Sequence, residues 1–73
     1  MAAVDAREQF ARNLRAQRLR RGLSQEALGE ASGLHRTEVS LLERAGRDPR
    51  LSTISRLARA LGIPAATLLD GID

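Results

Sequence analysis

Apolar residues recur along the chain at steps of three and four, which is the spacing of one face of an α-helix. No segment alternates apolar and polar residues with the two-residue period of a half-buried strand. Turn-forming residues separate the apolar segments: Gly22, Gly33, Gly46 and Gly62 each follow one of them. The pattern therefore predicts an all-α bundle of short helices with tight connections.

Five helices are expected, and capping residues help to place them. Asp5 and Ser24 are suited to the N-cap positions of the first and second helices, because their side-chain oxygens can accept from free amides. Pro64 is suited to the first position of the last helix. The predicted helices span about residues 5–21, 24–32, 36–44, 52–61 and 64–69.

The fourth predicted helix has a clear apolar stripe, made of Leu51, Ile54, Leu57, Ala58 and Leu61. Such a stripe faces a shared core. With 73 residues the chain is one domain, close to the lower size limit for folding alone. We expect a single domain over residues 1–73, with an N-terminal extension of about residues 1–9.

The connection between the second and third helices is the most informative feature. Gly33 turns the chain within two or three residues, which forces the two helices to cross steeply. Gly29 is small enough for the backbones to approach. The apolar side chains expected to hold the pair together are Leu28, Leu34, Val39 and Leu42. This arrangement is a helix-turn-helix.

At these residues the sequence resembles the phage-repressor/Cro-like (XRE) helix-turn-helix family. The resemblance spans about residues 10–70 and includes Gln25 at the start of the second helix, the two glycines, and Val39 and Leu42. It implies a five-helix domain of the lambda-repressor-like type. It also implies sequence-specific binding of double-stranded DNA, with the helix at about residues 36–44 in the major groove.

The resemblance places base contacts at Arg36, Thr37, Ser40 and Leu41, with Glu38 beside them. Arg36 can pair with guanine O6 and N7, and it has no obvious partner within the chain. Glu38 has two interpretations: it accepts from cytosine N4, or it caps its own helix from a position three residues after His35.

Phosphate contacts are expected around this helix, at Ser24, Gln25, His35, Arg44, Arg47 and Arg50. Ser24 can cap its helix and bind phosphate at once. For each of the three arginines a solvated surface role is equally open. His35 stands where the family usually has Ser or Thr, which are better caps, so phosphate contact and simple exposure are the two interpretations.

Two charged residues face the predicted core. Arg18 follows Leu14 by four residues and Glu43 follows Val39 by four, so each lies on an apolar helix face. We expect an ion pair between the first and third helices; the alternative is that each charge reaches outward to solvent.

At Ala45 the sequence departs from the family it resembles, which often has Gly there. We expect Gly46 to take the left-handed conformation one residue later.

Composition limits the function. The net charge is +3, from 12 basic and 9 acidic residues, and every basic residue is Arg. Arg favours phosphate binding, although a GC-rich genome would also favour it. The chain has no Cys and one His, so no metal site, cofactor or enzyme activity is expected. No apolar stretch is long enough for a membrane span or a secretory signal, which suits a cytoplasmic, bacterial or phage-type protein.

The predicted function is a transcriptional regulator, either a repressor or a small controller protein, that binds a palindromic operator as a homodimer. The candidate dimer residues are Ile63, Leu68, Leu69 and Ile72, although Leu68 and Leu69 can equally close the monomer core. The alternative function is an antitoxin or protein-interaction module that also binds its own operator.

Overall fold

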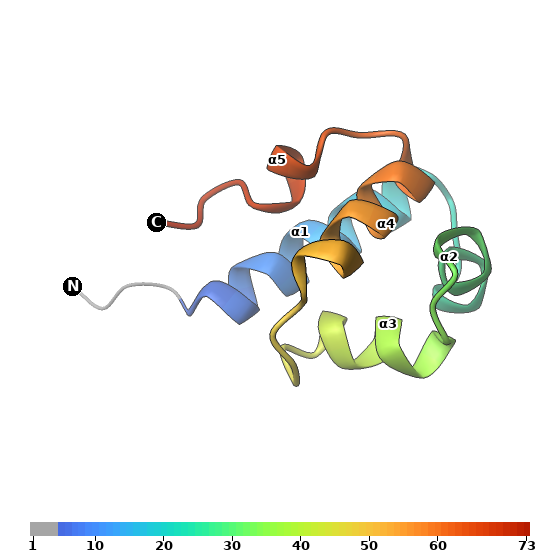
Figure 1. Ribbon diagram of the computed structural model, residues 1–73, viewed down its shortest axis with the longest axis horizontal. Coiled ribbons are helices and arrows are strands. Elements are labelled where there is room, and N and C mark those ends of the chain that lie inside the picture. The colour runs from blue at the N-terminus through green and yellow to red at the C-terminus, as the bar shows by residue number, and fades with distance from the viewer. Residues whose placement is uncertain (1–4) are drawn as a thin grey trace.

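The structure is a computed structural model that describes residues 5–73. This part of the chain forms α1 (Ala6–Arg20), α2 (Gln25–Ser32), α3 (Arg36–Glu43), α4 (Leu51–Leu61) and α5 (Ala65–Leu68) (Figure 1). The predicted all-α, five-helix class is confirmed. Of the predicted N-terminal extension, residues 1–4 lie outside the described residues, whereas residues 6–9 belong to α1.

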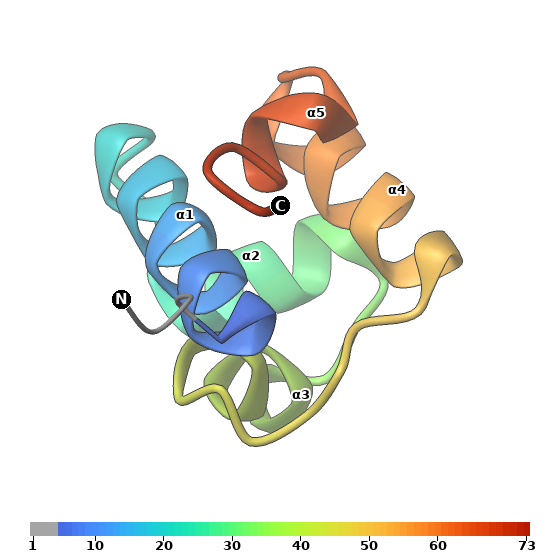
Figure 2. The same cartoon turned by 90° about the vertical axis from the view of Figure 1, so that its left-hand side faces the viewer.

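The helices surround one apolar core. In both views α3 and α5 lie on opposite sides of the bundle, with α1 and α4 between them (Figures 1 and 2). α3 packs against α1 and α2, and α4 packs against α2 and α5. The core residues are Phe10, Leu14, Leu28, Val39, Leu42, Ile54, Leu57, Ala58, Leu61 and Leu68. Only the inner face of α3 is needed for this core, so its outer face is left at the edge of the molecule.

The predicted caps at Asp5 and Ser24 form, and the helix boundaries lie within one residue of the predicted ones. Asp5 Oδ1 accepts from the Arg7 amide at 2.8 Å, and Ser24 Oγ accepts from the Ala27 amide at 2.9 Å. α4 starts at Leu51 rather than residue 52, and Pro64 is the N-cap of α5 rather than its first residue. The assignment of Leu51 to the apolar stripe is wrong: the residue is 83% exposed, because the first turn of α4 extends past the core.

The segment at the end of α5 is hydrogen-bonded to α1, a contact that the sequence analysis does not predict. Asn13 Nδ2 donates to the carbonyl of Leu68 at 2.9 Å and to that of Asp70 at 2.8 Å. Gln9 Nε2 donates in turn to Asn13 Oδ1 at 3.0 Å. These bonds satisfy carbonyls at and just after the end of α5 that have no helical partner. They hold α5 over the core.

Neither a membrane span nor a metal cluster occurs in the described chain. No helix formed by residues 5–73 is both long and apolar enough to cross a bilayer. These residues also form no group of three or more His, Asp or Glu side chains suited to a metal ion.

Candidate nucleic-acid interface

The predicted turn between α2 and α3 is confirmed in detail. Gly33 has a φ of 76°, and the Leu34 amide donates to the Gly29 carbonyl at 2.9 Å. A Cβ built on Gly29 would lie 2.7 Å from the carbonyl oxygen of Leu34 and 3.2 Å from the amide nitrogen of Arg36. The two helices thus meet backbone to backbone, which only glycine permits at this point. Their relative orientation is consequently fixed.

α3 has one buried and one outward face. Val39 and Leu42 are fully buried in the core. Arg36 and Thr37 are exposed, and the two other predicted base-contact residues, Ser40 and Leu41, are half-buried. These four positions are thus at least partly accessible on the side away from the bundle.

His35 caps α3, although Ser and Thr are better caps and only phosphate contact and exposure are predicted for it. Its Nδ1 accepts from the Thr37 amide at 3.0 Å. The imidazole therefore replaces the usual Ser or Thr oxygen at this N-cap. Nδ1 can accept only without a proton, which leaves Nε2 as the N–H donor on the exposed side of the ring. A phosphate contact through Nε2 stays a prediction.

Arg36 has a partner within the chain, contrary to expectation. Its Nη1 lies 3.1 Å from Glu26 Oε2 in α2, and both side chains are about two-thirds exposed. Spacing along the chain does not predict this pair, because the two residues belong to different helices. An exposed pair of this kind adds about 0–1 kcal/mol and is easily exchanged. Arg36 thus remains accessible, in an orientation biased by Glu26, and its base contact stays a prediction.

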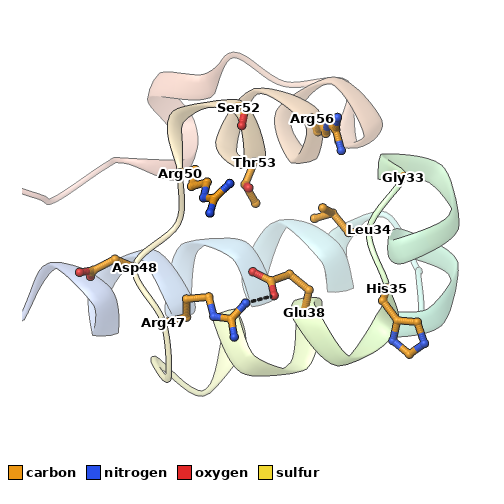
Figure 3. Close-up of a pocket in the computed structure, with 10 residues that line it drawn as sticks. All are labelled: Gly33, Leu34, His35, Glu38, Arg47, Asp48, Arg50, Ser52, Thr53 and Arg56. Atoms are coloured by element: carbon orange, nitrogen blue, oxygen red, sulfur yellow. Dashed lines mark hydrogen bonds and ion pairs between the residues drawn. The ribbon is translucent and has the colours of Figure 1, made fainter.

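Glu38 does not cap its own helix, because its carboxylate is bound to a residue outside α3. Its Oε1 accepts from Arg47 Nη1 at 2.6 Å, across from α3 to the loop that follows it (Figure 3). Its side chain is 23% exposed, whereas that of Arg47 is about half exposed. Two residues that had separate predicted contacts with DNA are therefore bonded to each other.

Arg18 and Glu43 form the predicted ion pair, and the solvent-facing alternative is wrong. Two hydrogen bonds join them, Nε to Oε2 at 2.6 Å and Nη2 to Oε1 at 2.9 Å. Only 11% and 4% of their side chains are exposed. Hydrogen bonding to Glu43 raises the pKa of Arg18, against the opposing effect of burial. The pair joins α1 to the end of α3.

Further polar groups complete this buried cluster. Arg18 Nη1 donates to the Leu23 carbonyl at 2.8 Å, and Gln25 Nε2 donates to Glu43 Oε1 at 3.2 Å. Gln25 had been predicted to bind phosphate. Its amide nitrogen is directed inward to Glu43, so its side chain also ties the start of α2 to α3.

A groove of about 480 Å³ lies between α3, the loop after it and the start of α4. Figure 3 shows Arg47 and Arg50 at the loop side and Arg56 on α4. Arg50 is the N-cap of α4 but makes no side-chain cap. Two acids also line the groove: Glu38, bound to Arg47, and Asp48, whose Oδ1 lies 3.6 Å from Arg7 Nε. The predicted phosphate residue Arg44 lies outside this groove, at the C-cap of α3.

The end of α3 differs from the prediction. Ala45, not Gly46, takes the left-handed conformation, with a φ of 58°. The Gly46 amide donates to the Leu41 carbonyl at 2.9 Å and the Ala45 amide to that of Leu42 at 3.2 Å. This hydrogen-bond pattern requires the left-handed residue directly after the C-cap, so an alanine occupies a conformation that favours glycine.

The candidate dimer residues divide into two groups. Leu68 is 0% exposed and takes the core role, not the interface role. Ile63 and Ile72 are half-buried against that core, and Leu69 is exposed. Leu69 is thus the most accessible apolar residue of this set. The assignment of Ile63, Leu69 and Ile72 to a dimer contact stays a prediction.

Comparison with known proteins also identifies a helix-turn-helix. A family model described as helix-turn-helix (HTH_3) matches residues 14–68. Control protein C.SmaI of Serratia marcescens is 46% identical over 66 residues, which are 90% of this chain and 79% of that protein.

Two solved structures have the same fold. The hypothetical transcription factor NHTF from Neisseria superposes with a TM-score of 0.87 at 42% identity, over 94% of this chain and 79% of the other. The restriction-modification controller protein C.AhdI from Aeromonas hydrophila gives a TM-score of 0.83 at 42% identity, over 85% of this chain and 94% of the other.

Proposed function

Because the chain belongs to the helix-turn-helix (HTH_3) family of DNA-binding transcriptional regulators, we propose that it reads its operator with α3 in the major groove. The observation that carries this proposal is the outward face of α3. The core uses Val39 and Leu42, while Arg36 and Thr37 are exposed at the end of the helix that reaches furthest into a groove.

Each outward residue has a definite chemical role in this proposal. Arg36 donates to guanine O6 and N7, for which its planar guanidinium is suited. Thr37 contacts a thymine methyl or a phosphate. Ser40 and Leu41, one turn further along, contact base edges as the groove curves away. Glu38 is bonded to Arg47, so we propose that it acts through Arg47 and not by contacting a base.

Phosphate contacts around α3 fix its register on the duplex. The proposed residues are Ser24, Gln25, His35, Arg44, Arg47 and Arg50. Support comes from their positions at the starts of α2 and α3, at the end of α3 and in the loop before α4. Amides and arginines at such positions bind phosphate without reading sequence.

We further propose that the protein is a homodimer on a palindromic operator, and that it acts inside the cell as a controller of a restriction-modification system. The similarity to C.SmaI and C.AhdI, whose names describe control proteins, supports the controller role. Two-fold symmetry would place two copies of α3 one helical turn of DNA apart, about 34 Å. The exposed Leu69 and the half-buried Ile63 and Ile72 provide apolar surface for the contact.

Selection of bound duplexes from a random library tests these proposals together. We expect an enriched palindrome with half-sites centred about 10 base pairs apart, and sedimentation equilibrium should give a dimer. Enrichment of a single unrepeated half-site, with a monomer in solution, would refute the dimer. Failure to enrich any sequence would refute operator reading by α3.

A further inference from the structure

The ion pair between Glu38 and Arg47 lies where α3 meets the loop that leads to α4. Glu38 Oε1 and Arg47 Nη1 are 2.6 Å apart, and Glu38 is the more buried partner. This is the shortest of the ion pairs that join α3 to another segment near the outward face; the pair between Arg36 and Glu26 is longer and more exposed. Figure 3 shows the Arg47 side chain extending from the loop toward α3 to reach Glu38.

Few backbone hydrogen bonds hold this loop. Within the described chain, the amides of Arg47 and Asp48 donate no hydrogen bond, and Pro49 has no N–H to donate. The backbone bonds stop at Gly46 and resume with the carbonyl of Arg50, at the start of α4. Side-chain contacts must therefore fix the path of the loop. Pro49 lies beside Phe10 and Ile72. Of the two ion pairs, the one from Glu38 to Arg47 is shorter than the one from Arg7 to Asp48.

The ion pair leaves most of the Arg47 guanidinium accessible. An arginine has five N–H donors, and within the described chain only one from Arg47 is bonded. Its orientation is nevertheless set, and ordering a free arginine side chain upon DNA binding would otherwise reduce affinity. A carboxylate facing DNA by itself would repel phosphate, whereas one that binds an arginine can increase affinity by orienting it.

We propose that Glu38 is a positioning residue for DNA binding: it holds Arg47, and with it the loop, so that the guanidinium meets a backbone phosphate beside α3. This inference rests on the proposed function. Glu38 itself does not contact DNA in this arrangement. It acts through Arg47, and its effect must vanish when Arg47 is absent.

The test compares two substitutions of Glu38 by fluorescence anisotropy on the selected site and on random duplex. Glu38→Gln keeps an oxygen that can accept from Arg47, whereas Glu38→Ala removes it. We expect affinity to fall from wild type to Gln to Ala, by roughly threefold and roughly tenfold. If Glu38 did nothing but repel phosphate, both variants would bind DNA more tightly than wild type and by the same factor. That result would overturn the proposal.

The Arg47→Ala background supplies the second measurement. There the two Glu38 substitutions should cause no loss, and the salt dependence of wild-type binding should flatten by about one phosphate contact when Arg47 is removed. An equal loss in both backgrounds would mean that Glu38 acts independently of Arg47, which contradicts the proposal.

Control measurements distinguish loss of folding, loss of a negative charge and loss of the positioning role. Asp70→Asn removes one exposed carboxylate from the C-terminal segment, away from α3, and should change affinity less than Glu38→Ala does and in the opposite direction. Unfolding in urea identifies any variant that loses structure, in which case Glu38→Gln, the closest in shape, carries the test. If the wild-type protein binds no duplex, the proposed function fails; if it binds but Glu38 and Arg47 show no coupling, only the positioning role fails.

Discussion

Removal of Glu43 should destabilise the protein far more than removal of any exposed charge. Glu43→Ala leaves the Arg18 guanidinium buried with one remaining acceptor, the Leu23 carbonyl. Two bonds of 2.6 and 2.9 Å are lost, as is the acceptor for Gln25. Breaking a buried pair in this way costs about 3–5 kcal/mol. A domain of this length has a total stability of roughly 4–11 kcal/mol, so the variant should be close to its unfolding threshold.

Urea unfolding followed by circular dichroism measures this loss. Glu26→Ala is the matched control, because it breaks an exposed pair, with Arg36, and should cost less than about 1 kcal/mol. The double substitution Arg18→Met with Glu43→Leu removes both charges and should recover much of the stability lost in Glu43→Ala. The reasoning would be refuted if Glu43→Ala and Glu26→Ala were equally mild, or if a double-mutant cycle on Arg18 and Glu43 gave no coupling.

Three other substitutions test separate parts of the interface. Arg36→Ala should weaken binding to the selected site by about 1–3 kcal/mol and blur one base preference; an equal loss on random duplex would exclude base reading. Ala45→Gly should raise the free energy of unfolding by about 0.5–1 kcal/mol, because it relieves a left-handed alanine at the cost of a more flexible unfolded chain. A lower urea midpoint would contradict this. Gly29→Ala should cost about 1–3 kcal/mol, since its Cβ meets the Leu34 carbonyl at 2.7 Å; an unchanged midpoint would show that the two helices can separate freely.

The helices and the turn between α2 and α3 were predictable because their causes are local. Apolar spacing sets which face of a helix is buried, and the left-handed residue at Gly33 follows from glycine's lack of a Cβ. The pairing of Arg18 with Glu43 was also predictable, because each charge lies on an apolar face and has little choice of partner. The resemblance to known regulators then supplied the candidate DNA-contact residues.

The remaining contacts of the site depend on how the helices cross. Arg36 with Glu26 and Arg47 with Glu38 are pairs of long side chains on different segments, so their meeting is set by interhelical distance and not by spacing along the chain. Asn13 is a similar case, since its partners are carbonyls more than fifty residues away.

The helix-turn-helix, the outward face of α3 and the buried charges follow from local sequence pattern. That Leu68 belongs to the core, that Leu51 lies outside it and that Ala45 takes the left-handed position after α3 became clear only from the packed helices. The physical reason is the range of the interactions. Helix periodicity and glycine conformation act within a few neighbouring residues, whereas burial and side-chain pairing are settled only when separate helices are brought together.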